Sequence, residues 1–255
     1  MQGKEKVMDC SALFGKYDGT IVLYNMSSDT YSVYNKARSL KRFTPYSTFK
    51  ILNSIIALET GVVKDADAVF TWDTVRYPPE HWWPQPWYGR HTMRSAIRFS
   101  VVPFYREVAT RIGDDRMKKY VDAFGYGNCD ISSGIDAFWL NGSLGISAME
   151  QVAFLIRFYR NEPGVKKKTI DTVKSLLVLE NENSCSLSVK TGRGWGFLKD
   201  APTMVLGWYI GYVERENDVW FFALNIEGDS MNDIQKLRTD IVMKVLEQRG
   251  VIRHT

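Results

Sequence analysis

The sequence of 255 residues is poor in the side chains that build disulfide frameworks and metal sites. It has three cysteines, which are odd in number, widely spaced and free of any C-x-x-C pair: Cys10, Cys129 and Cys185. This pattern offers neither a disulfide framework nor a zinc site, so we interpret the thiols as buried or incidental. There are also only three histidines, none in a two-ligand pattern such as H-E-x-x-H: His81, His91 and His254. We therefore expect no metal site.

Long apolar runs and sustained basic stretches are missing as well. No apolar run approaches the roughly 20 residues that span a bilayer, and the opening residues MQGKEK lack the apolar part of an export signal. We expect no membrane segment, and either a cytosolic protein or one whose signal peptide has been removed. The formal charge of +4 comes from 33 basic and 29 acidic residues spread along the chain, with one tight basic run at 166–168. Without a basic stripe, nucleic acid is not an expected partner.

The patterns of apolar residues predict strands near both ends of the chain and helices in the middle. Short β-branched and aromatic runs at 19–24 and 30–34 flank a Ser-Ser-Asp turn and predict an N-terminal hairpin. Similar runs predict strands at 187–191, 204–213 and 219–226, followed by an amphipathic helix over 233–248. Between these ends, helical patterns dominate at 47–59, 94–112, 116–124 and 147–159.

This order predicts an α+β fold in which one central antiparallel sheet is assembled from both termini and flanked by helices, with an inserted helical lobe. With 45% hydrophobic residues, the chain can bury a large core. We expect a single domain over 1–255, with a sheet lobe at about 1–45 and 160–255 and a helical lobe at about 46–159. A catalytic cleft is expected between the two lobes.

The first candidate for chemistry is the motif Ser47-Thr48-Phe49-Lys50, which opens an apolar helical segment after Pro45. Residues three apart share a helix face, so the Ser47 hydroxyl can meet the Lys50 amine in a buried setting. Burial lowers the pKa of a lysine, which lets the amine act as a base. The motif alone is weak, because S-x-x-K is expected about once by chance at this composition.

Two further motifs follow in a meaningful order. Lys190-Thr191-Gly192 lies on a predicted strand, where a glycine lets a ligand approach the backbone. Between the two sites, Ser100-Val101-Val102 precedes Pro103, which interrupts a helical pattern and can leave a serine facing a cleft. The three motifs together supply a nucleophile, a second hydroxyl for proton relay and a cation for an anionic substrate.

Further segments extend this pattern along essentially the whole chain: RFTPYSTFKI at 42–51, LETG at 58–61, YGN at 126–128, FWL at 138–140 and GW at 207–208. With the three motifs, they resemble the class D β-lactamases, the oxacillinases, among the penicillin-recognising serine enzymes. The S-x-V and YGN forms favour class D over class A enzymes, which carry S-D-N and use a separate glutamate for deacylation. The resemblance implies a β-lactamase/transpeptidase-like fold and a β-lactam as the small-molecule substrate.

The resemblance also implies roles for single residues. Lys50 would be carboxylated by carbon dioxide to a carbamate that serves as general base for acylation and deacylation, with no other cofactor. Trp139 would donate its indole N–H to that carbamate, and Val102 and Leu140 would shield it. The backbone N–H groups of Ser47 and Arg193 would form the oxyanion hole. Substrate binding would involve the strand after Lys190 and a carboxylate-binding arginine: Thr191, Gly192, Arg193 and Arg238.

Each of these residues has a structural alternative. Trp139 could be a core aromatic and Ser100 a polar residue beside a helix break. Lys190 could be a solvated strand lysine, Arg238 a surface residue of an amphipathic helix, and YGN only a turn. Val102 and Leu140 would pack in a core in either case. Two departures from the family bear on substrate preference: Tyr46 stands where a smaller residue is usual, and the segment 77–88, rich in proline and tryptophan, is either a packed loop or a wall of the cleft.

Three functions compete for this sequence. The first is a serine β-lactamase that is periplasmic or secreted, for which the resemblance leaves homodimer formation open. The second is a penicillin-binding sensor domain, which is acylated without turnover, belongs to a transmembrane protein and tends to carry a polar residue at the position of Val102. The third is a D,D-peptidase acting on cell-wall peptides. Val102 favours the enzyme over the sensor.

Overall fold

The computed structural model describes residues 3–182, 185–195 and 204–252. Its centre is a seven-stranded sheet with the strand order β1-β3-β2-β9-β8-β7-β6. The strands are β1 (Lys4–Val7), β2 (Gly19–Asn25), β3 (Thr30–Tyr34), β6 (Val178–Glu182), β7 (Cys185–Trp195), β8 (Val205–Arg215) and β9 (Asp218–Gly228). Every neighbouring pair is antiparallel except β1 and β3, which are parallel. The predicted sheet built from both ends of the chain is therefore confirmed.

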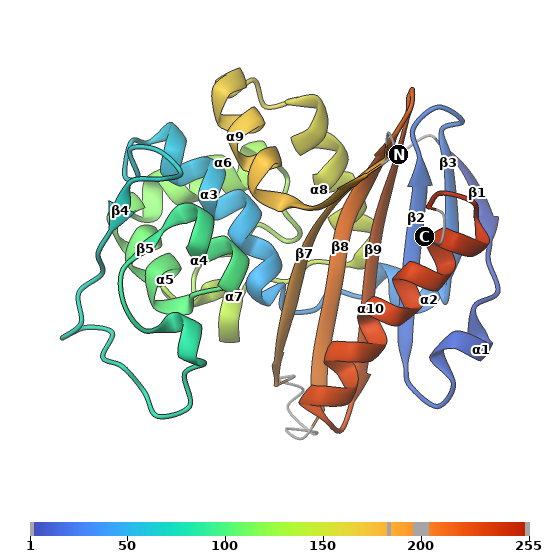
Figure 1. The fold of residues 1–255 in the computed structure, drawn as a ribbon, viewed down its shortest axis with the longest axis horizontal. Coiled ribbons are helices and arrows are strands. Elements are labelled where there is room, and N and C mark those ends of the chain that lie inside the picture. Colours follow the sequence, from blue (N-terminus) through green and yellow to red (C-terminus); the bar gives the residue numbers. More distant parts are fainter. Residues whose placement is uncertain (1–2, 183–184, 196–203, 253–255) are drawn as a thin grey trace.

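The middle of the sheet joins the two ends of the chain directly. β2 pairs with β9 in a register that sets Gly19 opposite Ile226 and Asn25 opposite Trp220. All residues of β2 are buried. Strand β2 is apolar on both sides because α10 (Met231–Gln248) and α8 (Ala148–Arg160) cover opposite faces of the sheet (Figure 1).

Local capping explains where these two covering helices begin. Ser147 and Glu150 form a capping box at the start of α8, in which each side chain accepts from the other residue's backbone N–H. Ser230 caps α10 by accepting from the N–H of Asp233. The predicted helices at 147–159 and 233–248 are confirmed, and each begins at its polar cap.

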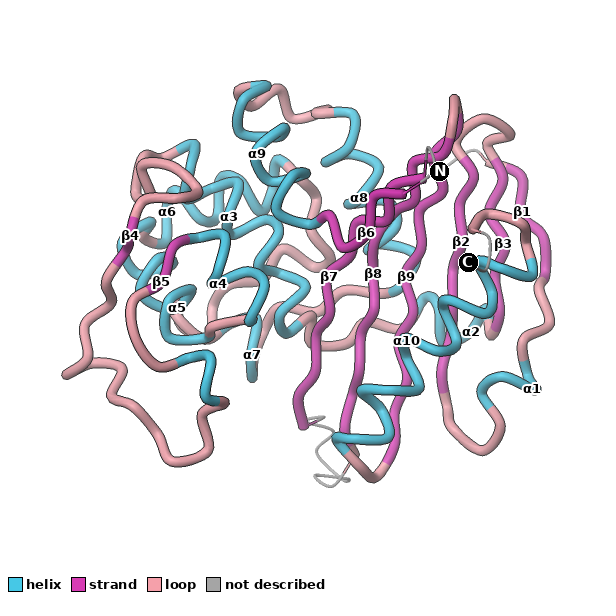
Figure 2. Tube along the Cα trace, in the orientation of Figure 1, coloured by secondary structure: helices cyan, strands magenta, loops and turns pink. Residues whose placement is uncertain are grey.

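The remaining helices pack beside the sheet, next to β7 (Figures 1 and 2). They are α3 (Lys50–Glu59), α4 (Met93–Phe99), α5 (Val102–Ile112), α6 (Asp114–Ala123), α7 (Phe138–Asn141) and α9 (Lys167–Leu177), together with short 3₁₀ turns η1 (Tyr46–Phe49) and η2 (Gln85–Trp87). Two short strands, β4 (Val69–Phe70) and β5 (His91–Thr92), pair outside the main sheet. Two short helices, α1 (Ser11–Phe14) and α2 (Lys36–Leu40), lie on the N-terminal side.

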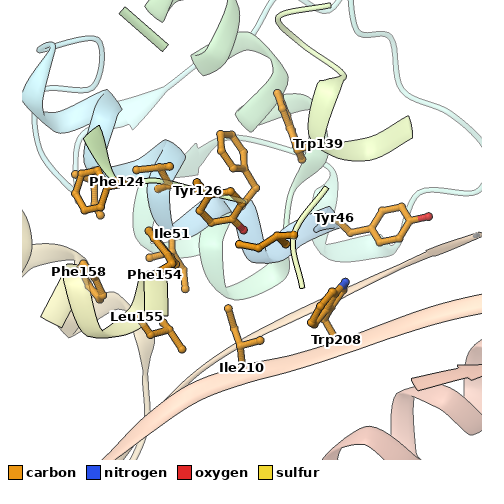
Figure 3. Close-up of a cluster of buried hydrophobic side chains, with 14 of the residues drawn as sticks. Tyr46, Ile51, Phe124, Tyr126, Trp139, Phe154, Leu155, Phe158, Trp208 and Ile210 are labelled. Atoms are coloured by element: carbon orange, nitrogen blue, oxygen red, sulfur yellow. The ribbon is translucent and has the colours of Figure 1, made fainter. Parts of the chain in front are cut away.

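The largest core fills the space between these helices and the sheet. Figure 3 shows part of it, with Trp208 and Ile210 projecting from β8 toward the helices. Phe49 lies at its centre, with ring contacts to Tyr126, Phe138 and Trp139. This packing fixes the start of α3 against the sheet, because a close-packed core leaves little freedom to its large side chains.

The sequence predicted a helical stretch over 94–112 that Pro103 interrupts, and the structure divides it there into two helices. α4 ends at Phe99, Ser100 adopts a left-handed conformation with φ 55° and ψ 40°, and α5 begins at Val102. Pro103 occupies the first turn of α5, where its missing N–H is harmless. Pro103 therefore starts a second helix, and Ser100 is left at the junction between the two.

Candidate active site

The predicted nucleophile and base meet at the start of α3. Ser47 lies in the 3₁₀ turn η1, and Lys50 is the first residue of the α-helix that continues from it. The Lys50 Nζ donates a hydrogen bond to the Ser47 Oγ at 2.7 Å. Lys50 is fully buried within the core. The expected S-x-x-K pairing is thus present in the fold.

Burial decides the charge of Lys50. It lowers the pKa of this amine well below the ordinary value, and the nearby Lys190 lowers it further. This shift favours the neutral amine, whose lone pair can accept a proton or react with an electrophile.

Trp139 of α7 packs against Phe49, the last residue of the turn that carries Ser47. Its indole is fully buried and stacks on Phe49, with 5.4 Å between ring centroids and 26° between planes. Its Nε1–H has no acceptor among the residues that the structure describes. A buried donor without a partner is unfavourable, so this N–H is available to an acceptor bound in the site.

A second hydroxyl–amine pair faces the first. The Lys190 Nζ, on β7, donates to the Ser100 Oγ at 2.6 Å and to the Thr191 carbonyl at 3.0 Å. Burial lowers the pKa of Lys190 to about 7, with a smaller effect from the charge of Arg238. Lys190 can therefore exchange a proton with Ser100 near neutral pH.

Arg238 of α10 is buried rather than a surface residue of the helix. It is 5% exposed, and its guanidinium donates to the Gly192 carbonyl at 2.6 Å. Burial lowers the pKa of Arg238 to about 10, helped by the charge of Arg193. The group is still cationic at neutral pH, so it can bind a carboxylate.

These groups border a pocket of about 790 Å³. Of the predicted site residues, those that line it are Ser47, Ser100, Val102, Leu140, Thr191, Gly192, Arg193 and Arg238. Lys50, Trp139 and Lys190 are buried next to Ser47, Phe49 and Ser100 respectively. The lining includes the arginines Arg98, Arg193 and Arg238, and none of the described lining residues is acidic. The pocket therefore favours an anionic ligand.

The tryptophan-rich segment 77–88 both packs and lines the pocket. Trp83 and Trp87 are buried, and Trp87 donates its indole N–H to the Phe99 carbonyl at 2.9 Å. Trp82 is 54% exposed and lines the pocket together with Pro84 and Trp87. Both interpretations of this segment therefore apply, to different side chains.

The YGN motif does not line the pocket. Its Tyr126 belongs to a buried hydrogen-bond network around Thr48, the residue after Ser47. Gln151 donates to the Thr48 Oγ1 at 2.8 Å, and the Tyr126 hydroxyl lies 3.4 Å from both the Thr48 Oγ1 and the Gln151 amide. All three side chains are buried. This network holds the residue after Ser47, so the motif is more than a turn.

Several pocket residues were not predicted from the sequence. They are Arg98, Phe99, Gly194, Trp195, Met231 and Gln235. Tyr46 also lines the pocket, although the sequence marks it only as a departure from the family. Phe99 could have been found from its place beside Ser100, and Gly194 and Trp195 from theirs after K-T-G. Met231 and Gln235 carry no local signal, because only the packing of α10 on β8 brings them to the pocket.

Comparisons with known proteins agree with this geometry. The family model of the penicillin binding protein transpeptidase domain matches residues 18–247. The chain is 38% identical to β-lactamase OXA-48 of Klebsiella pneumoniae over 93% of this chain and 85% of that protein.

Two solved structures share the fold over nearly all of both chains. The C-terminal domain of the BlaR penicillin receptor of Bacillus licheniformis has a TM-score of 0.89 at 33% identity and covers 99% of each chain. The class D β-lactamase FUS-1 of Fusobacterium nucleatum has a TM-score of 0.85 at 33% identity, covering 93% of this chain and 94% of its own. On the family match and these identities, the chain belongs to the penicillin-binding transpeptidase family and, within it, to the class D β-lactamases and their receptor-domain relatives.

Proposed function

We propose that the protein is a serine β-lactamase that hydrolyses the lactam amide of penicillin-type antibiotics through a covalent acyl-enzyme on Ser47. The observation that carries this proposal is the 2.7 Å contact between Ser47 Oγ and the buried Lys50 amine, whose pKa is lowered by burial, at the edge of a cationic pocket. A nucleophile beside a base, facing a pocket that suits an anion, is the arrangement that acyl transfer requires. Such an enzyme meets its substrate outside the cytoplasm, so the same proposal expects a periplasmic or secreted protein.

In the acylation step, the Ser47 Oγ attacks the lactam carbonyl and gives up its proton toward the Lys50 side. The C–N bond of the ring breaks, an ester forms on Ser47, and the ring nitrogen takes up a proton. The Ser100 hydroxyl, bonded to Lys190 at 2.6 Å, is the candidate donor of that proton. Arg238 binds the substrate carboxylate, and the N–H groups of Ser47 and Arg193 receive the developing oxyanion. Water then cleaves the ester and restores Ser47.

We further propose that Lys50 is carboxylated. Two features of the site fit such a group: burial lowers the pKa of the Lys50 amine, which favours its neutral form, and the Trp139 Nε1–H lacks an acceptor among the described residues. When bound, the carboxyl group would supply an anionic oxygen that acts as general base for both half-reactions. Trp139 would hold that oxygen by donating its N–H, while Val102 and Leu140, which line the pocket, limit the access of water.

A turnover measurement tests the hydrolase proposal. With a chromogenic cephalosporin in large excess, we expect many product molecules per protein molecule, because water can deacylate Ser47. A single burst that stops at one equivalent would contradict hydrolysis. It would favour the sensor function, the second candidate, which the likeness to the BlaR receptor domain supports.

Bicarbonate dependence tests the carboxylated lysine. Trp139→Phe keeps the stack on Phe49 but removes the N–H, so we expect kcat to fall about tenfold in air-equilibrated buffer and to recover when bicarbonate is added. The matched control is Trp208→Phe, because the Trp208 indole N–H already bonds to the Thr44 carbonyl at 2.9 Å. The control should respond to bicarbonate as the wild type does. If added bicarbonate changes the kcat of neither the wild type nor Trp139→Phe, this role for Lys50 is excluded.

A further inference from the structure

Tyr46, directly before the nucleophile, has an unusual backbone conformation. It is the first residue of η1, and its φ is 50°. In this left-handed region the Cβ of a large side chain crowds the following carbonyl, so an aromatic residue adopts it only when surrounding contacts hold it there. Tyr46 is 4% exposed, and Figure 3 shows its ring extending away from the cluster formed by Phe124, Phe154 and Phe158.

Two contacts that hold the Tyr46 side chain come from the end of β7. A Cβ built on Gly194 would lie 2.1 Å from the Tyr46 Cε1 and 2.4 Å from its Cζ, so only a glycine leaves room for the ring. The Tyr46 hydroxyl donates a hydrogen bond to the Trp195 carbonyl. One side chain therefore spans from the residue before Ser47 to two consecutive residues of β7.

Gly192 makes a second close approach on the same face of β7, since alternate residues of a strand share a face. A Cβ built on Gly192 would lie 2.9 Å from the Pro45 carbonyl oxygen and 3.3 Å from the Thr48 amide nitrogen. Arg193 is thus flanked on both sides by glycines that pack directly against the turn carrying Ser47. Its backbone cannot move relative to Ser47 without disturbing the Tyr46 ring.

We propose that Tyr46 is a positioning residue that fixes the separation between the backbone N–H of Ser47 and that of Arg193, the two donors to the developing oxyanion. This inference rests on the proposed function. The ring acts as a spacer against Gly194, and the hydroxyl ties the end of β7 to the nucleophile turn. In the described part of the chain the Ser47 N–H has no acceptor of its own, so it is free for the substrate oxygen.

Three substitutions separate the parts of this contact. Tyr46→Phe removes only the hydrogen bond to Trp195, and we expect kcat to fall about threefold to tenfold with little change in KM. Tyr46→Ala and Gly194→Ala remove or displace the ring, and we expect kcat to fall about 10-fold to 100-fold, which is less than the loss of a whole oxyanion donor. The loss should appear in kcat because these donors act mainly in the transition state.

The double variant Tyr46→Ala/Gly194→Ala tests whether the two residues act through one contact. Without the ring, the added methyl group loses its three nearest neighbours, which are all atoms of the Tyr46 ring, so we expect the double variant to be no slower than Tyr46→Ala alone. The control is Tyr159→Phe, whose hydroxyl bonds to Glu214 at 2.7 Å and is not part of the pocket; its kinetics should match the wild type. Melting temperatures identify any variant that fails to fold.

The affinity for a boronic acid inhibitor provides a further test, because it would not change if Tyr46 only stabilised the fold. The Ser47 Oγ adds to boron and forms a tetrahedral anion whose oxygen occupies the oxyanion position. We expect the affinity for this compound to fall across the variants by the same factor as kcat/KM. Losses that multiply in the double variant, an unchanged boronate affinity, or a Tyr46→Phe enzyme with wild-type kcat would each overturn the proposal.

The outcome for Tyr46 is distinguishable from the outcome for the hydrolase function. If the wild type is acylated without turnover, hydrolysis is refuted, and the burst rates of the same variants then report on Tyr46. A wild type that is never acylated would overturn both proposals.

Discussion

The burial of Lys190 lowers the stability of the fold and also lowers the pKa of its amine into the range where it can transfer a proton at neutral pH. Its pKa of about 7 in the folded protein lies well below the ordinary lysine value of 10.5, and desolvation is the main cause. Between these two values the unfolded chain binds more protons than the folded one, so the stability of the wild type rises with pH. Below pH 7 both states are protonated, and the full penalty for burying the charge remains.

Replacing this amine with an apolar side chain should therefore stabilise the fold and abolish the reaction. For Lys190→Met we expect unfolding to require about 1–4 kcal/mol more at pH 6, with kcat/KM reduced by orders of magnitude because Ser100 loses its partner. The stability gain should shrink at pH 9, where the folded lysine is already neutral. Melting curves of both proteins at the two pH values measure this, and an equal gain at both would contradict the assigned pKa.

The sequence pointed to the side chains proposed to react, but not to the contacts that hold them. Ser47, Lys50, Ser100 and Lys190 are carried by short motifs whose spacing has a chemical reason. Tyr46 has no such motif, because its contact with Gly194 joins residues 148 positions apart, and only the packing of β7 on η1 creates it. Arg238 lies on α10, which the sequence predicts to be an amphipathic helix. Its burial likewise follows only from the packing of this helix on the sheet.

The segment 77–88 contributes Trp82, Pro84 and Trp87 to the lining of the pocket. Exposed large aromatic side chains are uncommon away from binding sites, and three of them line this pocket: Trp82, Phe99 and Trp195. Since apolar contact is worth about 25 cal/mol per Å², a substrate with an aromatic acyl group gains from covering Trp82.

Trp82→Ala should weaken binding of such substrates selectively. We expect KM to rise about fivefold to tenfold for a penicillin with a large aromatic acyl group and to stay unchanged for 6-aminopenicillanic acid, which has none. Tyr88→Ala is the matched control, since Tyr88 is an exposed aromatic of the same segment that does not line the pocket. A similar rise in KM for both substrates would show that Trp82 does not contact the acyl group.

Several elements were beyond sequence reasoning for identifiable reasons. β1 is exposed along its whole length, so it has no apolar alternation to predict a strand, and its parallel pairing with β3 depends on the edge that β3 offers. α9 begins inside the lysine run at 167, where charge hides a helix whose buried face is Ile170, Val173 and Leu177. By contrast, the hairpin of β2 and β3 has both strand composition and a turn, and it was predicted correctly.

At the scale of the whole molecule, a buried ion pair connects the N-terminal part of the chain to β9, the last strand in the sequence. Arg38 of α2 bonds to Glu227 of β9 at 2.7 Å and to Asn225 at 2.7 Å, with exposed Asp18 as a further partner. Arg38 and Glu227 are both largely buried. Breaking a buried pair leaves an uncompensated charge, which is strongly unfavourable.

Glu227→Gln should therefore destabilise the protein by about 3 kcal/mol, as measured by urea unfolding at neutral pH. The control is Asp67→Asn, which breaks the solvent-exposed pair with Arg94 and should leave stability nearly unchanged. If the two variants lose equal stability, the Arg38 network does not hold the two ends of the chain together.

The pairing of β2 with β9 also sets an order in time. During synthesis the turn carrying Ser47 and helix α3 emerge early, whereas β7, β8, β9 and finally α10 emerge late, and the sheet cannot close until β9 reaches β2. A chain that ends before β7 has Ser47 and Lys50 but neither Lys190 nor the Arg193 backbone. Under the proposed function, the reactive centre is therefore complete only after β9 and α10, which carries Arg238, have docked.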